Sequence, residues 1–252
     1  MRLVIKIGTQ VISSRTGLDT RQVGNIINDI SKLFKLGHEI IIVSSGAIAA
    51  GLPELKFKSK LEKKVAAAVG QPLLIQSYIK EAKKHKITVG QILILSDDFT
   101  NHLHFKNFLL NIEEMLKHKI LPIINENDVM KRVDLRVNDN DALGAMVAVG
   151  VRADKLIILT NQQGLFTKNP DHDKKAKLIK QVDIINSKIK ALCLNKSQLG
   201  VGGMLAKVNA AEYATKRGIE TLIGNGRKKG IINEATSENF SGTRFIARHK
   251  NK

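Results

Sequence analysis

The chain has 252 residues, of which 43% are hydrophobic, so it can build a substantial core as one large domain or two small ones. A single cysteine excludes an internal disulfide, and no apolar run is as long as a bilayer span or a signal-peptide core, so we expect a cytoplasmic protein without membrane insertion. The formal net charge of +18 favours anionic ligands, but aromatic residues make up only 4% and no nucleic-acid-binding module is recognisable, so specific nucleic-acid binding is not expected.

Apolar strands and helices alternate along the chain. Buried strands are predicted at residues 3–7, 39–43, 91–95, 121–124, 155–159 and 221–223. Helices are predicted at residues 20–35, 72–84, 105–116 and 142–151 and after the glycine-rich segment 200–207, and residues 56–64 are expected to form a charge-rich linker. This alternation predicts an α/β fold, a three-layer α/β/α sandwich with a mostly parallel central sheet. No composition break separates independent domains, so residues 1–252 are expected to form one domain.

Residues with useful chemistry collect where the predicted strands end. Right-handed crossovers bring the carboxyl ends of parallel strands to one edge of the sheet, where open α/β sheets bind ligands. The residues at these ends are Lys6 and Gly8, Ser45 and Gly46, Asn125 to Asp128, Asn138 to Asp141, and Thr160 and Asn161. Ordinary turns and helix caps explain each pair locally, but they do not explain why all of them share one edge.

The stretch from Leu121 to Asp141 is the densest of these groups. A short apolar strand is followed by Asn-Glu-Asn-Asp at 125–128, a basic spacer, and Asn-Asp-Asn-Asp at 138–141. Asn and Asp favour turns, so the stretch has a simple interpretation as two tight turns around a loop. That interpretation leaves unexplained why so many oxygen acceptors crowd the end of one buried strand.

A glycine-rich segment, Gly200 to Lys207, opens a predicted helix. Backbone N–H groups and an ammonium group at a helix start suit a phosphate. The segment matches neither GxxxxGK[ST] nor GxGxxG, so by itself it is weak evidence for a nucleotide site.

Taken together, these motifs resemble the glutamate 5-kinase branch of the amino acid kinase family. The matching runs are VIKIGT at 4–9, VSSGAIAAG at 43–51, AAVGQ at 67–71, PIINEND at 122–128, DND at 139–141 and GGM at 202–204. The resemblance implies the amino acid kinase fold, with a lobe at about 1–150 that binds the amino acid and a lobe at about 151–252 that binds ATP. It also implies ATP-dependent phosphorylation of the side-chain carboxylate of L-glutamate, the first step of proline biosynthesis.

The resemblance also implies roles for individual residues. The catalytic residues would be Lys6, Asp141 and Lys207. The glutamate-binding residues would be Ser45, Gly46, Asp128 and Asn140. The ATP-binding residues would be Lys6, Gly8, Thr160, Asn161, Val201, Gly202, Gly203, Met204 and Lys207. A glutamate side chain has a pKa of about 4.3 and is already ionised at neutral pH, so the reaction needs charge stabilisation and not a general base. Mg²⁺ is expected to be held mainly by the ATP phosphates, without a protein metal site.

The chain departs from the family pattern at three positions near the expected nucleotide site. Asn161 stands where the family has an aspartate, and Val201 and Ala206 stand where it has threonines. Many family members also continue into a C-terminal RNA-binding-like (PUA) domain, which is not expected here because the sequence ends at Lys252. The family further implies self-association and a downstream glutamyl phosphate reductase as a partner.

Two alternatives remain open on the sequence alone. The first is a sister enzyme of the same family that acts on another small acid or on a nucleotide. The second is a non-catalytic regulatory or binding protein built on this scaffold, which the three departures would favour. Retention of Lys6, Asp141 and Lys207 argues against the second alternative.

Overall fold

The computed structural model describes residues 1–55, 62–130, 140–170, 172–193 and 203–248. Its central sheet has eight strands in the order β5-β6-β4-β1-β7-β9-β10-β8. Six strands run parallel: β1 (Arg2–Ile7), β4 (Glu39–Ser44), β5 (Thr88–Ile94), β6 (Ile120–Glu126), β7 (Lys155–Thr160) and β9 (Glu220–Asn225). β10 (Gly242–Phe245) pairs antiparallel with β9, and β8 (Gln181–Val182) pairs parallel with β10. The predicted mostly parallel α/β sheet is confirmed, whereas β8 and β10 were not predicted.

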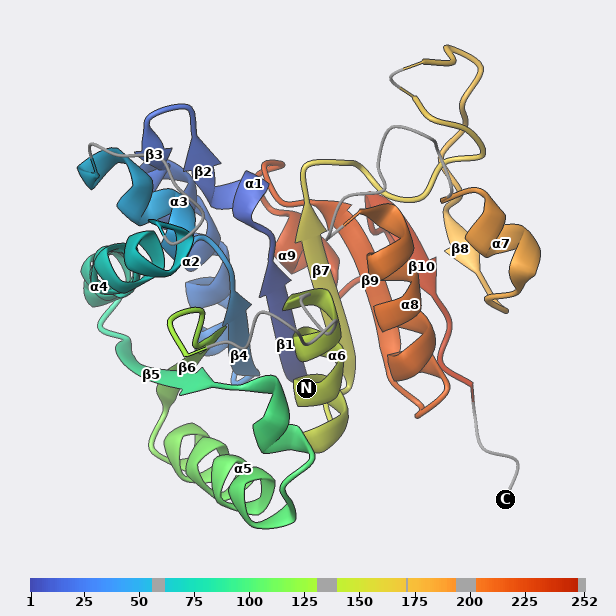
Figure 1. Ribbon diagram of the computed structural model, residues 1–252. Coiled ribbons are helices and arrows are strands. Elements are labelled where there is room, and N and C mark those ends of the chain that lie inside the picture. The colour runs from blue at the N-terminus through green and yellow to red at the C-terminus, as the bar shows by residue number, and fades with distance from the viewer. Residues whose placement is uncertain (56–61, 131–139, 171, 194–202, 249–252) are drawn as a thin grey trace.

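Helices cover both faces of this sheet, with α6 and α8 in front of it and α2 and α9 behind it in Figure 1. The helices are α1 (Thr9–Ile12), α2 (Thr20–Lys35), α3 (Ala47–Gly51), α4 (Glu62–Lys83), α5 (His102–Lys117), α6 (Asn140–Gly150), α7 (Ser187–Ala191), α8 (Met204–Thr215) and α9 (Ile231–Glu234), with short 3-10 turns at Leu52–Glu54 and Ser96–Phe99. A small hairpin, β2 (Ser13–Ser14) and β3 (Gly17–Leu18), follows α1. In the ranges that are described, none of the helices combines the length and the apolar character needed to cross a membrane.

Alternation along the strands decides which residues face which layer. In β1, Ile5 and Ile7 belong to the hydrophobic cluster under α2, whereas Val4 belongs to the cluster under α6 and α8. Successive side chains of a strand point to opposite faces, so Lys6 shares the face of Val4. The strand register therefore directs the ammonium group of Lys6 toward α6 and α8.

The prediction of a separate helix that begins at Pro72 is wrong. The prediction of a linker at residues 56–64 is also wrong for residues 62–64, which are helical. Residues 56–61 lie outside the described ranges, and from Glu62 one helix continues to Lys83 with Pro72 inside it. An internal proline costs a helix one backbone hydrogen bond. Burial of Leu74 and Tyr78 beyond the proline, together with buried alanines before it, stabilises the continuous helix.

Two other predicted boundaries shift. β5 begins at Thr88, three residues before the predicted start, and β6 continues to Glu126. Asn125 and Glu126 therefore lie in the strand, are paired with β5 and are almost fully buried. The interpretation of these two residues as part of a tight turn is wrong, because the sheet ladder extends beyond the apolar run.

An ion-pair cluster joins the starts of β7 and β9 to Arg244 of β10, and it provides a pH test of the fold. Glu220 lies opposite Lys155 and contacts its Nζ at 2.9 Å, and Arg244 Nη1 donates to Glu220 at 2.5 Å. Burial acts to raise the pKa of Glu220, but the hydrogen bonds and charges of Lys155 and Arg244 outweigh it and lower the pKa.

Glu220→Gln is expected to reduce the free energy of unfolding at pH 7 by about 1 kcal/mol, the value for a partly exposed ion pair. A lowered folded-state pKa stabilises above the unfolded value of about 4.3 and ceases to do so as the pH falls through the folded-state pKa. The difference between the two proteins should therefore disappear in acid. Urea unfolding at pH 7 and pH 3 measures it, with exposed Glu238→Gln as the control. An equal difference at both pH values would contradict this account.

Candidate active site

Three charged side chains meet at the carboxyl edge of the sheet. Asp141, the second residue of α6, contacts Lys6 Nζ of β1 through Oδ1 at 2.5 Å and Lys207 Nζ of α8 through Oδ2 at 2.9 Å. The three residues are 0%, 4% and 6% exposed, in that order. A carboxylate removed from water in this way requires charged partners, and here it holds one cation on each oxygen.

The charges of the two lysines control the ionisation of Asp141. Burial by itself would raise the pKa of this carboxyl, but the two ammonium groups outweigh the burial and lower the pKa below its usual value. The carboxylate therefore stays charged and does not act as a proton acceptor at neutral pH. Two cations share one anion, so the group carries an excess positive charge in a buried place, which favours an anionic ligand.

Close backbone packing fixes the position of Lys6. A Cβ atom on Gly144 of α6 would lie 3.2 Å from both Cβ and Cγ of Lys6. On the other side, the N–H of Gly8 donates to the carbonyl oxygen of Leu159 at 3.1 Å. The stem of Lys6 therefore packs closely against α6, and the backbone just beyond it is tied to the end of β7.

Asn140, the first residue of α6, organises a second group of polar side chains. Its Nδ2 lies 3.0 Å from the carbonyl oxygen of Ser44, 2.7 Å from Ser45 Oγ and 3.2 Å from Asn125 Oδ1. Asn125 Nδ2 in turn donates to Gln71 Oε1 at 2.8 Å. The carbonyl of Ser44 can only accept, so it settles which end of the Asn140 amide faces it. The other end, Oδ1, is buried and has no hydrogen-bond partner among the described residues.

Sequence reasoning assigned no role to Asn125 or Gln71, although both lie in runs that carried the family resemblance. The structure brings them to Asn140 because β6 extends to Glu126 and because α4 continues through Pro72. Gln71 was missed because the sequence pattern predicted a new helix starting at Pro72, which left Gln71 outside that helix.

Ser45 contacts this amide group through its hydroxyl and Gly46 follows it, whereas Asp128 is placed only by its position three residues after Asn125. The N–H of Ser45 donates to the carbonyl oxygen of Ile7 at 3.1 Å, which ties the loop after β4 to the end of β1. Gly46 has a φ of +108°, a conformation that side-chain-bearing residues rarely adopt. Asp128 is half-buried just beyond β6. Residues 131–139, which comprise most of the basic spacer together with Asn138 and Asp139 of the second cluster, lie outside the described residues.

The predicted ATP-binding residues of the second half lie at the ends of β7 and at the start of α8. Thr160 ends β7 and donates from Oγ1 to Oδ1 of the exposed Asn161 at 3.3 Å. Gly203 precedes α8 and Met204 begins it. Val201 and Gly202 fall outside the described residues.

The sequence profile described as the amino acid kinase family matches residues 1–225. The chain belongs to the amino acid kinase family. It is 39% identical to a glutamate 5-kinase of Marinomonas sp. (strain MWYL1), over 98% of this chain and 68% of that protein. A glutamate 5-kinase of Streptococcus pneumoniae is also 39% identical, over 99% of this chain and 69% of the relative.

These matches confirm the resemblance predicted from the sequence and support a kinase over a non-catalytic binding protein. Two solved structures with 15–16% sequence identity to this chain support the fold alone. Carbamate kinase from Giardia lamblia bound to AMP-PNP has a TM-score of 0.70 at 16% identity, covering 97% of this chain and 98% of that chain. UMP kinase from Bacillus anthracis has a TM-score of 0.66 at 15% identity, covering 98% and 96%.

Proposed function

We propose that this chain transfers the γ-phosphoryl group of ATP to the side-chain carboxylate of L-glutamate, which gives L-glutamyl 5-phosphate for proline biosynthesis. The observation that carries the proposal is the buried group of Lys6, Asp141 and Lys207 at the carboxyl edge of the sheet. It lies in a chain whose curated relatives are glutamate 5-kinases.

The proposed chemistry relies on positioning and charge. The acceptor carboxylate is ionised at neutral pH and attacks without deprotonation, so the obstacle is the approach of two anions. Lys6 and Lys207 offset the charge that develops on the transferring phosphoryl group, and Asp141 holds the two ammonium groups in place. ATP supplies the phosphoryl group, with Mg²⁺ held mainly by its phosphates.

The amide group around Asn140 suits the amino acid. The buried Oδ1 of Asn140 is an acceptor that an α-ammonium group would satisfy, and the carboxylate of Asp128 would add an opposite charge. Ser45 and Gly46 would line the same site beside Asn140. An acylated amine has no positive charge, so this set of acceptors favours a free amino acid over an N-acylated one.

The remaining roles are proposed on the resemblance. Gly8, Thr160, Asn161, Val201, Gly202, Gly203 and Met204 would bind ATP together with the two lysines. Self-association, a cytoplasmic location and a glutamyl phosphate reductase as downstream partner belong to the same proposal.

The direct test traps the acyl phosphate. The purified protein is incubated with ATP, Mg²⁺, L-glutamate and hydroxylamine, and the γ-hydroxamate is measured. Product that depends on both ATP and L-glutamate is expected. Product with another acid but none with glutamate would refute the proposed substrate, and N-acetylglutamate and aspartate are the informative comparisons.

Asn140→Ala is expected to raise the KM for glutamate about tenfold or more, because loss of one hydrogen bond to a charged group costs about 1.5–3 kcal/mol. The KM for ATP should change much less. Steady-state hydroxamate kinetics measure both constants, and exposed Asn111→Ala on α5 is the matched control. Equal changes in the two KM values would place Asn140 outside the glutamate site.

A further inference from the structure

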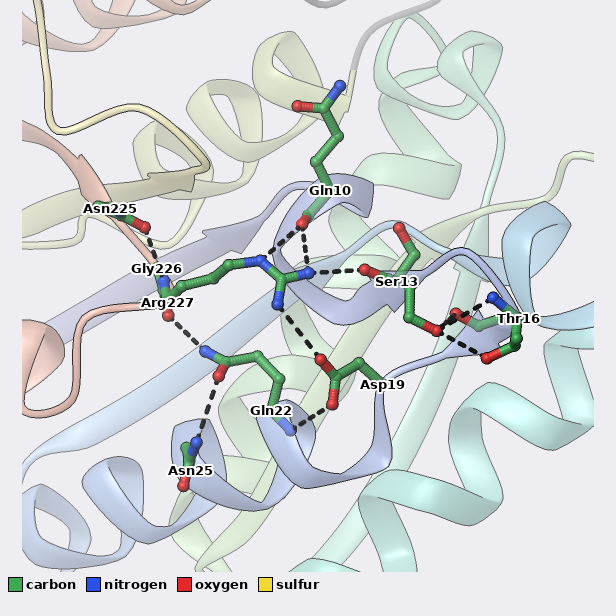
Figure 2. A network of polar contacts seen from close by, with 11 residues as sticks. Gln10, Ser13, Thr16, Asp19, Gln22, Asn25, Asn225, Gly226 and Arg227 are labelled. Carbon is green, nitrogen blue, oxygen red and sulfur yellow. Dashed lines mark hydrogen bonds and ion pairs between the residues drawn. The ribbon is translucent and has the colours of Figure 1, made fainter.

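The turn that follows β9 joins segments of the chain that are far apart in sequence. Figure 2 shows Arg227 reaching from this turn to α1 and to the start of α2. Its Nη2 donates to the carbonyl oxygens of Gln10 at 3.0 Å and Ser13 at 2.6 Å, and its Nε lies 3.2 Å from the same Gln10 oxygen. Its Nη1 donates to Asp19 Oδ2 at 3.2 Å.

The residue before Arg227 is tied to the same region through its backbone. The N–H of Gly226 donates to the carbonyl oxygen of Thr160 at 2.8 Å, and its carbonyl oxygen accepts from Nε2 of the buried Gln22 at 2.6 Å. A Cβ atom on Gly226 would lie 2.6 Å from Val11 Cγ1 and 2.9 Å from Leu159 Cβ. The turn therefore fits tightly between the end of β7 and α1.

These contacts lie beside the residues proposed to act on ATP. The segment from Gln10 to Ser13 begins two residues after Gly8, and the guanidinium of Arg227 donates to the carbonyl oxygens at both ends of this segment. Gly226 holds Thr160 at the end of the neighbouring strand. One turn thus fixes the backbone on two sides of the buried lysine.

We propose that Arg227 is a positioning residue for phosphoryl transfer: it holds α1, and with it the turn at Gly8 and the end of β1, against the end of β7. The inference rests on the proposed function for its kinetic readout. Arg227 acts through the backbone and not by contact with the reactants, since its described partners are two carbonyl oxygens and the Asp19 carboxylate.

The shape of the side chain explains why arginine serves here. Acceptors at Gln10, Ser13 and Asp19 lie on different segments, and a guanidinium presents five N–H donors in one rigid plane. A lysine has one ammonium group at the end of a flexible stem and cannot reach all three acceptors in a fixed arrangement. Lysine is therefore expected to replace arginine poorly, although it keeps the charge.

The experiment compares Arg227→Ala and Arg227→Lys with Arg217→Ala. Arg217 is a matched control because it is exposed, also donates to a backbone carbonyl, that of Tyr213, and lies beyond the end of α8. Displacement of reacting groups by about 1 Å can cost about 100-fold in rate, so we expect kcat to fall about tenfold in both Arg227 variants. The KM for ATP should rise more than the KM for glutamate, and added guanidinium ion should restore part of the rate of Arg227→Ala. The control should keep the wild-type constants.

If Arg227 had a purely structural role, Arg227→Ala would lower the thermal midpoint, the KM values for ATP and glutamate would change equally, and guanidinium ion would not restore the rate. Wild-type kcat and KM values in Arg227→Ala would overturn the inference. If the wild-type protein forms no hydroxamate, the proposed function fails, and amide hydrogen exchange then decides the positioning role separately. Faster exchange at residues 8–14 in Arg227→Ala, with unchanged exchange in β5 and β6, would support it, and unchanged exchange at residues 8–14 would overturn it.

Discussion

Asp141→Asn is expected to reduce kcat by about 100- to 1000-fold, the range for removal of a group that organises transition-state charge. The substitution preserves the shape of the side chain but removes the anion that Lys6 and Lys207 share. An asparagine has one acceptor oxygen, so one lysine would face an N–H₂ donor. The two buried ammonium groups would repel each other and lose their fixed positions.

The same variant should lose stability, because an uncompensated buried charge costs about 3–5 kcal/mol. Hydroxamate kinetics at 25 °C and urea unfolding separate the two effects. Asp173→Asn is the control, since that carboxylate pairs with the exposed Lys168 on the surface. Wild-type turnover in Asp141→Asn would refute the role assigned to Asp141.

Acid provides a further check on this pair of lysines and their carboxylate. The pKa of Asp141 is lowered although burial acts to raise it, so the stability it contributes is present above the unfolded value of about 3.9. That contribution is lost as the pH falls through the lower folded-state pKa. The stability difference between wild type and Asp141→Asn should therefore narrow only in strong acid, and a difference that closes near pH 6 would contradict the lowered pKa.

Sequence patterns placed Lys6, Asp141 and Lys207 near one edge of the sheet because those patterns are local, and the family resemblance predicted that the three act together. Lys6 lies near the end of its strand, Asp141 and Lys207 lie in the first turns of their helices, and parallel strands end at a common edge. The face on which Lys6 lies follows from the alternation of Val4 and Ile5 between the two clusters. The contacts among the three side chains are the part that only the structure provides.

The contacts of Arg227 and of Gln71 could not be predicted from the sequence pattern. The acceptors of Arg227 include the carbonyl oxygens of Gln10 and Ser13, and backbone groups are the same in every residue. Gln71 reaches Asn125 only because α4 passes through Pro72, where tertiary packing overrides the local preference of proline. The interpretation of residues 121–141 as turns failed for Asn125 for a similar reason, since β5 pairing extends β6 beyond its apolar run.

At the crossing of α3 and α4, packing and helix propensity predict opposite effects of a glycine-to-alanine substitution on the free energy of unfolding. Gly70 lies inside α4, and a Cβ atom there would overlap the carbonyl oxygen of Ala47 and the backbone nitrogen of Gly51. A Cβ on Gly51 would in turn overlap the carbonyl oxygen of Ala66 and lie 2.7 Å from the nitrogen of Gly70. The two helices therefore meet backbone to backbone, where no side-chain rotation can make room.

Propensity alone would have Gly70→Ala stabilise the helix by about 1 kcal/mol. Packing requires α3 to move away from α4, and overpacking of this kind costs about 3 kcal/mol. We expect packing to win, because the overlapping atoms are backbone on both sides. Ala47 follows Ser45 and Gly46 directly, so the displacement should also raise the KM for glutamate.

Gly24→Ala is the matched control for this prediction. Gly24 lies inside α2, and the nearest atom to an added Cβ is Glu81 Oε2 at 2.9 Å, the end of a flexible side chain that can turn away. Helix propensity then applies without opposition, so the free energy of unfolding should rise by up to about 1 kcal/mol. Urea unfolding of both variants measures the contrast. If Gly70→Ala stabilised the protein as much as Gly24→Ala, α3 and α4 would not be packed closely enough to hold the loop at Ser45. The close packing would then not explain the position of the proposed glutamate-binding residues Ser45 and Gly46.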